Sequence, residues 1–150
     1  MSGWLRNARE GPSSPRPQES GCRVLVAEGN PLNRSVALRL LGRAGLRAVA
    51  VSNGRQAVEA ATVGQYDLIL LDIQMPEMDG FQAAAEIRRC LGPVQHPPII
   101  AMTTRQWPPD RHLAAGIDDY LPKPLRLEEL SGILRCWTGP DRRKPAFAGQ

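Results

Sequence analysis

Four polar side chains follow short apolar runs of this 150-residue sequence, at points where a buried strand would end. Glu28 comes after VLVA, Asp72 after LILL, Thr103 after PIIAM and Lys123 after DYLP. One such residue alone is an ordinary way to end a strand, but two carboxylates, a hydroxyl and an ammonium together suit phosphate chemistry. Mg²⁺ prefers carboxylate oxygens, and a lysine binds a phosphoryl group as a point charge. A carboxylate can also accept a phosphoryl group, since that transfer requires mostly positioning and neutralisation of charge.

The elements that must bring these residues together alternate between strand and helix. Apolar runs predict strands over residues 23–27, 47–51, 67–72, 98–102 and 119–122. Segments with helical periodicity predict helices over 31–44 and 54–63, after Gly80, in a short stretch ending near Ala115, and in a last stretch ending near Trp137. In the first of these helices Asn30 is the predicted cap, and one face carries Leu32, Val36, Leu40 and Leu41.

Five strand–helix units of this kind predict an α/β fold with a parallel sheet that is covered by helices on both faces. Right-handed crossovers restrict the topology, and a flavodoxin-like, doubly wound five-stranded sheet in the order 2-1-3-4-5 is the common solution. Ligands of such sheets bind at the carboxyl ends of the strands, beside the switch point between strands 1 and 3. The four polar residues are therefore expected at one edge of the sheet, with Glu28 and Asp72 at the switch point.

The overall charge of +4 does not predict nucleic-acid binding, because it lies mainly in the ends of the chain. Residues 21–138 hold 13 Lys and Arg against 12 Asp and Glu. No apolar run approaches the roughly 18 residues that a membrane span requires, and the N-terminus lacks the apolar stretch of a secretory signal. Three widely spaced cysteines predict neither a disulfide framework nor a zinc site, so a reducing cytoplasm is expected.

The ends of the chain differ in composition from its middle. Residues 1–20 and 139–150 are rich in proline, glycine and charge and poor in apolar side chains, which predicts a disordered N-terminal arm and a disordered C-terminal tail. One domain over 21–138 remains. That domain has no GxxxxGK[ST] loop, so binding of a nucleoside triphosphate is not predicted.

Four segments carry a resemblance to a known family: VLVAEGNPLNR, YDLILLDIQMPEMDGFQAAAEIR, PIIAMTT and GIDDYLPKPL. Together they resemble the receiver domain of two-component response regulators, especially the type attached to hybrid histidine kinases, over about residues 22–137. The resemblance implies that Asp72 accepts a phosphoryl group from a phosphohistidine and that Lys123 pairs with it. It implies signalling by protein contact, not enzymatic activity, with a histidine kinase or histidine phosphotransferase as the phosphoryl donor.

The resemblance also assigns a switch and a metal site. Thr103 and Tyr120 are expected to move together and to report phosphorylation across the face formed by the fourth helix, fifth strand and fifth helix, where a downstream protein would bind. Magnesium is expected to bind Glu28, Asp72 and the backbone carbonyl of Gln74.

Gly29 departs from the family pattern, in which a second acidic residue usually follows the first at the end of strand 1. Loss of a residue that hydrogen-bonds to a metal ligand lowers metal affinity roughly 10- to 100-fold. Loss of a carboxylate that contacts the metal itself should weaken Mg²⁺ binding by at least as much. Glu28, which is longer than aspartate, could reach inward, or a water could fill the gap. The segment 103–116 is a second departure, since it looks shorter than usual and Pro108 and Pro109 bar regular helix before them.

Two functions follow from these observations. The first is a stand-alone cytoplasmic receiver that is phosphorylated on Asp72. The second is a pseudo-receiver of the same fold, which binds or scaffolds partners without phosphorylation; Gly29 favours it, whereas intact Asp72, Thr103, Tyr120 and Lys123 favour the first. A small hydrolase with a phospho-aspartate intermediate is a more remote alternative, because it would use the second acid that Gly29 replaces.

Overall fold

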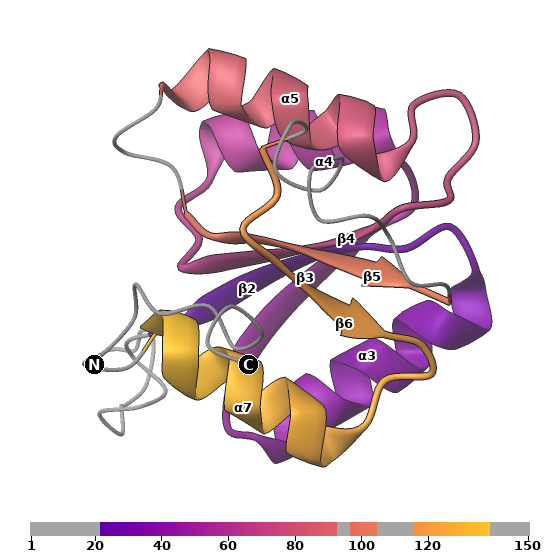
Figure 1. The fold of residues 1–150 in the computed structure, drawn as a ribbon, viewed down its shortest axis with the longest axis vertical. Helices are drawn as coiled ribbons and strands as arrows, with labels where there is room; N and C mark the ends of the chain where they lie inside the picture. The colour runs from indigo at the N-terminus through magenta and orange to yellow at the C-terminus, as the bar shows by residue number, and fades with distance from the viewer. Residues whose placement is uncertain (1–21, 93–96, 105–115, 139–150) are drawn as a thin grey trace, which may run out of the picture.

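The computed structural model describes residues 22–92, 97–104 and 116–138, and it places a parallel sheet at the centre of the molecule (Figure 1). Its strands are β2 (Arg23–Ala27), β3 (Arg47–Val51), β4 (Leu68–Asp72), β5 (Ile99–Thr103) and β6 (Asp119–Pro122). The order across the sheet is β3-β2-β4-β5-β6, and all four neighbouring pairs are parallel. The predicted order 2-1-3-4-5 is therefore confirmed.

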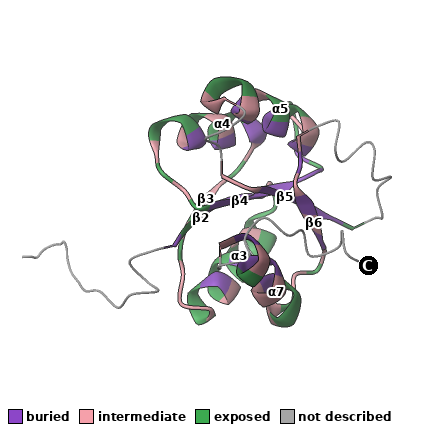
Figure 2. Ribbon diagram, turned by 60° about the vertical axis from the view of Figure 1, so that its left-hand side comes forward, coloured by how far each residue is buried: buried purple, intermediate pink, exposed green. Residues whose placement is uncertain are grey.

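Helices cover both faces of this sheet (Figure 2). The helices are α3 (Pro31–Arg43), α4 (Gly54–Val63), α5 (Gly80–Leu91) and α7 (Leu127–Thr138). The predicted helix ending near Ala115 lies outside the described residues, as do the arms 1–20 and 139–150. None of the described helices is both long enough and apolar enough to cross a membrane.

Alternation of side chains along the strands builds a separate core on each face. Val26, Leu70 and Met102 pack with α3 and α7 on one face, and Leu25 and Ile69 with α4 and α5 on the other. Every residue of β4 and β5 is buried, whereas the edge strand β3 is partly exposed along its whole length. This is the reason that LILLD and IIAMT read as continuous apolar runs in the sequence.

The strand register brings the predicted site residues to one edge of the sheet. Ala27 of β2 pairs with Leu71 of β4, so the residues that follow, Glu28 and Asp72, emerge side by side. Short connections then lead directly into capped helices. The side chain of Asn30 accepts a hydrogen bond from the amide of Asn33 at 3.0 Å, which caps α3 two residues after Glu28.

The predicted apolar face of α3 is only partly correct. Ala37 and Leu41 are buried and Leu40 packs against the core, but Leu32 and Val36 are exposed, with 72% and 40% of their surface accessible. The first turns of α3 lie at the carboxyl edge of the sheet, where Asn33 and Val36 border a hollow instead of packing on a strand. Periodicity alone could not find this, because the apolar residues of α3 cover a wide arc and several rotations of the helix would bury some of them.

Gly80 provides a test of how tightly the segment after Asp72 is packed. A Cβ atom on Gly80 would lie 2.5 Å from the carbonyl oxygen of Asp72 and 2.8 Å from the Cα of Ile73, so Gly80→Ala requires the backbone to move. We expect a loss of about 1–3 kcal/mol in the free energy of unfolding, measured by urea denaturation. Gly132→Ala is the matched control within α7, where nothing lies within 4 Å, and it should be stabilising by about 0.5–1 kcal/mol. Equal effects of the two substitutions would contradict this account.

Candidate functional site

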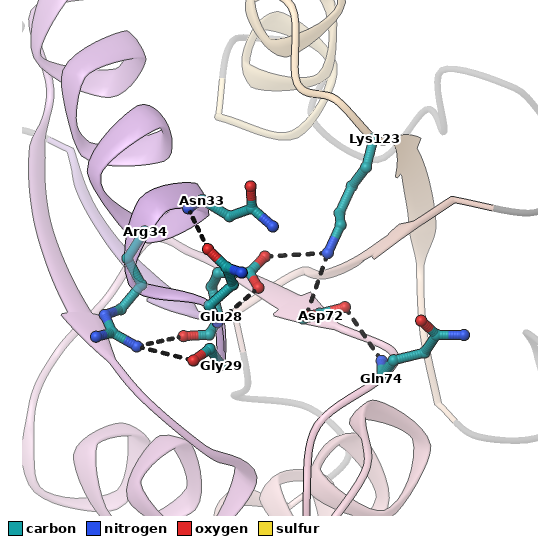
Figure 3. Close-up of polar contacts among 8 residues, drawn as sticks. Glu28, Gly29, Asn33, Arg34, Asp72, Gln74 and Lys123 are labelled. Carbon is teal, nitrogen blue, oxygen red and sulfur yellow. Dashed lines mark hydrogen bonds and ion pairs between the residues drawn. The ribbon is translucent and has the colours of Figure 1, made fainter.

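Lys123 connects two buried carboxylates at the carboxyl edge of the sheet (Figure 3). Its ammonium nitrogen lies 3.2 Å from Oε1 of Glu28 and 3.2 Å from Oδ2 of Asp72. The side chain of Lys123 is 15% exposed, and those of Glu28 and Asp72 are 4% and 5% exposed. Three of the four predicted residues therefore make direct contact, and each comes from a different strand end.

Backbone groups hold both carboxylates in place. The amide of Asn30 donates to Oε2 of Glu28 at 3.1 Å, and the amide of Gln74 donates to Oδ1 of Asp72 at 3.1 Å. The amide of Lys123 donates to the carbonyl of Thr103 at 2.8 Å, which ties the segment after β6 to the end of β5. Each carboxylate thus has one oxygen on a backbone amide and the other on the lysine.

Burial raises the pKa of the Asp72 carboxyl to about 6. The neighbouring Glu28 contributes to this rise of the pKa, whereas the hydrogen bond from Gln74 and the charge of Lys123 oppose it. Removal from water is the largest of these effects, and it raises the pKa because it disfavours the charged form of the carboxyl. Lys123 does not reverse the rise, because one ammonium cannot neutralise two carboxylates. Above about pH 6 the carboxylate form of Asp72, which is the nucleophilic form, still prevails.

Thr103 and Tyr120 lie in different surroundings. Thr103 ends β5 beside β4 and is buried, with 4% of its surface exposed. Tyr120 lies on β6, is partly buried, and packs against the core between the sheet and the α4–α5 layer. Their coupled movement stays a prediction.

The donor set of the site fits a hard divalent cation. Glu28 and Asp72 offer carboxylate oxygens from adjacent strand ends, and Lys123 neutralises only one of the two negative charges. Mg²⁺ accepts one or two carboxylates and keeps several waters, so no larger set of protein ligands is needed. Within the described ranges no third His, Cys, Asp or Glu completes a metal-binding group. The carbonyl of Gln74 remains the predicted third protein ligand.

Gly29 supplies no ligand, but the space beside it is open to a side chain. A Cβ atom there would meet the ring of Pro76 and the carbonyl of Ser52 at 3.6 Å, which is ordinary van der Waals contact. Nothing in the described surroundings of Gly29 would therefore block a larger side chain at this position. The sequence left two ways to fill the gap at Gly29, a longer Glu28 that reaches inward or a water. The carboxylate of Glu28 does point inward, to Lys123.

Sequence reasoning missed two features around the site. Arg34 donates from Nη1 to the carbonyl of Glu28 at 2.9 Å and to that of Gly29 at 3.3 Å. A hollow of about 250 Å³ also opens beside the site, between Lys123, Val36 and Leu125. The available signal for Arg34 was a cation close to the start of a helix, where anions are favoured. No sequence signal marked the hollow.

Comparison with known proteins assigns this arrangement to a family. Residues 24–135 match the family model of the response regulator receiver domain. The hybrid signal transduction protein dokA of Dictyostelium discoideum is 42% identical over 118 residues, which are 79% of this chain and 7% of dokA. The transcriptional regulatory protein TcrA of Mycobacterium tuberculosis is 37% identical over an aligned length of 144 residues, and the alignment covers 93% of this chain and 56% of TcrA. The chain thus spans far less than the full length of dokA and little more than half of TcrA.

Solved structures agree with this assignment. The receiver domain of sensor histidine kinase PA1611 from Pseudomonas aeruginosa, crystallised with a magnesium ion in the active-site cleft, is 40% identical with a TM-score of 0.71. The structural match covers 79% of this chain and 98% of the PA1611 receiver domain. The receiver domain of Ssk1 from Saccharomyces cerevisiae, solved in complex with the histidine phosphotransfer protein Ypd1, is 29% identical with a TM-score of 0.70, covering 79% of this chain and 91% of that one.

The raised pKa of Asp72 predicts a pH-dependent effect of Asp72→Asn in metal-free buffer with a chelator. Between the unfolded pKa of about 3.9 and the folded pKa of about 6, the native state binds more protons, so the stability of the wild type falls as pH rises. The neutral variant escapes this loss. Its free energy of unfolding should exceed that of the wild type by up to about 3 kcal/mol at pH 8, and the difference should vanish near pH 4.

The matched control is Asp67→Asn, since Asp67 is exposed and directly precedes the same strand at its opposite end. Urea denaturation across this pH range measures all three proteins. A difference between Asp72→Asn and the wild type that stays constant with pH would contradict the raised pKa.

The open space at Gly29 predicts that Gly29→Asp strengthens Mg²⁺ binding. The new carboxylate would restore the acid that the family usually carries and should raise the affinity at least roughly 10-fold, measured by isothermal titration calorimetry. Gly42→Asp adds the same charge in α3, where nothing lies within 4 Å of the added Cβ, and controls for net charge. No gain for Gly29→Asp over this control would mean that Glu28 already fills the metal position.

Proposed function

Because the chain belongs to the response regulator receiver domain family, we propose that it accepts a phosphoryl group on Asp72 from the phosphohistidine of a kinase or phosphotransferase. The observation that carries this proposal is the contact of Lys123 with both Asp72 and Glu28 at 3.2 Å. It supplies a buried nucleophile and a cation at the place where phosphate oxygens would arrive. Members of this family are signalling modules, and the phosphorylated state would act through contact with a further protein.

The transfer forms one bond and breaks one. An oxygen of Asp72 attacks the phosphorus, while the bond between phosphorus and the imidazole nitrogen of the donor breaks and leaves its electron pair on that nitrogen. The ammonium of Lys123 would pair with the negative charge of the incoming group, since it already lies 3.2 Å from Oδ2 of Asp72. The hydroxyl of Thr103, buried at the end of the neighbouring strand, would donate to a phosphoryl oxygen.

Magnesium would be held by Glu28, Asp72 and the carbonyl of Gln74. When bound, it would neutralise charge on the phosphoryl oxygens and orient them. The ammonium of Lys123 would balance part of the remaining carboxylate charge, because it contacts both Glu28 and Asp72 at 3.2 Å.

A phosphorylation-independent scaffold is the second candidate function. One observation favours it: Gly29 removes a carboxylate that the family usually places at the metal. A pseudo-receiver would keep the same surfaces and bind its partner constitutively. Whether the receiver acts alone or within a longer protein stays a prediction.

The surroundings of Lys123 support a phosphoryl donor with an apolar contact surface. The hollow beside the site is bordered by Val36 and Leu125, and Leu32 is exposed in the first turn of the same helix as Val36. A partner that inserts a histidine toward Asp72 would cover these apolar side chains. The complex of the related Ssk1 receiver domain with Ypd1 supports a phosphotransferase as one such partner.

The downstream protein would bind the face that includes β6 and α7. Tyr120 lies on β6, and its neighbour Asp119 accepts a hydrogen bond from Nε1 of Trp137 in α7 at 3.0 Å, so the two elements are joined. The third part of the predicted face, within residues 105–115, lies outside the described ranges. No nucleic-acid contact is proposed, because the domain carries nearly balanced charge.

The proposed acceptor can be tested with acetyl phosphate and Mg²⁺. Intact-mass measurement should find the mass of one added phosphoryl group, which hydroxylamine should remove because an acyl phosphate is labile to it. Asp72→Asn should abolish the addition, whereas the control Asp67→Asn should retain it, since Asp67 is exposed and directly precedes β4 at the end opposite to the site. An unlabelled wild type, with beryllofluoride also failing to shift the NMR spectrum, would favour the scaffold.

A further inference from the structure

Arg34 contacts the chain just beside the site without touching the reacting groups. Its Nη1 atom donates to the carbonyl oxygens of Glu28 and Gly29, on the side of the connection that faces away from Lys123 (Figure 3). We propose that Arg34 is a positioning residue, which fixes the connection between β2 and α3 so that the carboxylate of Glu28 stays on Lys123 beside Asp72. This proposal rests on the proposed phosphoryl acceptor and adds a residue to its machinery.

The position of Arg34 in its helix goes against local preference. Arg34 is the fourth residue of α3, and the first turn of that helix contains no acidic residue. A cation close to a helix N-terminus opposes the helix dipole, so local energetics favour another residue type there. A residue that departs from local preference is expected to be compensated elsewhere. The two bonds to backbone carbonyls supply that compensation, and the partly buried position of the side chain shields them from water.

The connection needs a restraint because its middle residue is glycine. Gly29 separates Glu28 from the helix cap Asn30, and glycine loses more conformational freedom on folding than any other residue. Its backbone is not in the left-handed region, so the fold does not require glycine there. Before the connection, the amide of Glu28 is fixed by the carbonyl of Val51 at 3.1 Å. Arg34 fixes the next two carbonyls.

The restraint reaches the site through Glu28. Both oxygens of its carboxylate are engaged, one by the amide of Asn30 at 3.1 Å and the other by Lys123 at 3.2 Å. If the connection moved, the Asn30 amide would move with it, and Glu28 would lose the contact that aims it inward. Since Glu28 is the carboxylate that stands beside Asp72, its order determines how well the pair can hold a cation.

Arg34→Met tests the proposal, because methionine keeps the long apolar stem and the helix propensity but cannot donate a hydrogen bond. The backbone ¹⁵N order parameters of Gly29 and Asn30 should fall from the rigid value of about 0.85 toward or below about 0.6. The affinity for Mg²⁺ should fall roughly 10-fold, as it does when a residue that orients a metal ligand is lost. Arg39→Met is the matched control, since Arg39 is exposed on the same helix, and it should change neither quantity.

A second background separates positioning from any other role of Arg34. Gly29→Ala stiffens the connection directly, and its Cβ fits at 3.6 Å from its nearest neighbours. If Arg34 acts by restraining the connection, the loss of Mg²⁺ affinity caused by Arg34→Met should shrink toward that of the control in the Gly29→Ala background. A loss of the same size in both backgrounds would overturn the proposal.

Unchanged order parameters at Gly29 and Asn30 in Arg34→Met would also overturn it. This outcome is distinguishable from failure of the proposed function, because the order parameters are measured without phosphorylation. A wild type that is not labelled by acetyl phosphate would remove the acceptor role of Asp72, while the order parameters would still decide the role of Arg34. A general loss of stability would lower order throughout α3 and would count against the proposal.

Discussion

Two carboxylates and one ammonium are held in nearly dry surroundings at the edge of this sheet, and the chemistry of the protein depends on that imbalance. Glu28 and Asp72 each contact Lys123 at 3.2 Å, so two negative charges share one positive charge and the ionised group has a net charge of −1. Burial makes this charge costly, which appears as the raised pKa of Asp72. A divalent cation bound by the two carboxylates would relieve the cost. The site is therefore least favourable when it is empty and ionised, which is the state in which it would bind a metal ion under the proposed function.

The sheet sustains this imbalance because the three side chains lie at or directly after the ends of buried strands. β4 and β5 are buried throughout, and the parallel register sets Glu28 beside Asp72. The amide of Lys123 is tied to the end of β5 by the carbonyl of Thr103. Two cores of aliphatic side chains, one on each face, hold the strands in register, so the cost of the charges is offset by packing elsewhere.

Gly29 alters this design at one point. It removes a carboxylate, which lowers the negative charge near Asp72 but also leaves fewer ligands for a cation and a more flexible connection. Arg34 compensates for the flexibility and not for the missing ligand, because its bonds are to carbonyls on the far side of the connection.

The sequence by itself determined the class of fold, the order of the sheet and the residues at the strand ends. Buried parallel strands must be apolar on both faces, so runs such as LILLD are recognisable without tertiary information, and the topology of such sheets is restricted. Only the tertiary structure decided which side chains meet. The rotation of α3, with Leu32 exposed and Leu41 buried, depends on what lies beneath each turn, and the helical period does not contain that information. The inward direction of Glu28 and the bonds of Arg34 were likewise undetermined, because they depend on side-chain rotamers and on backbone carbonyls that any sequence would possess.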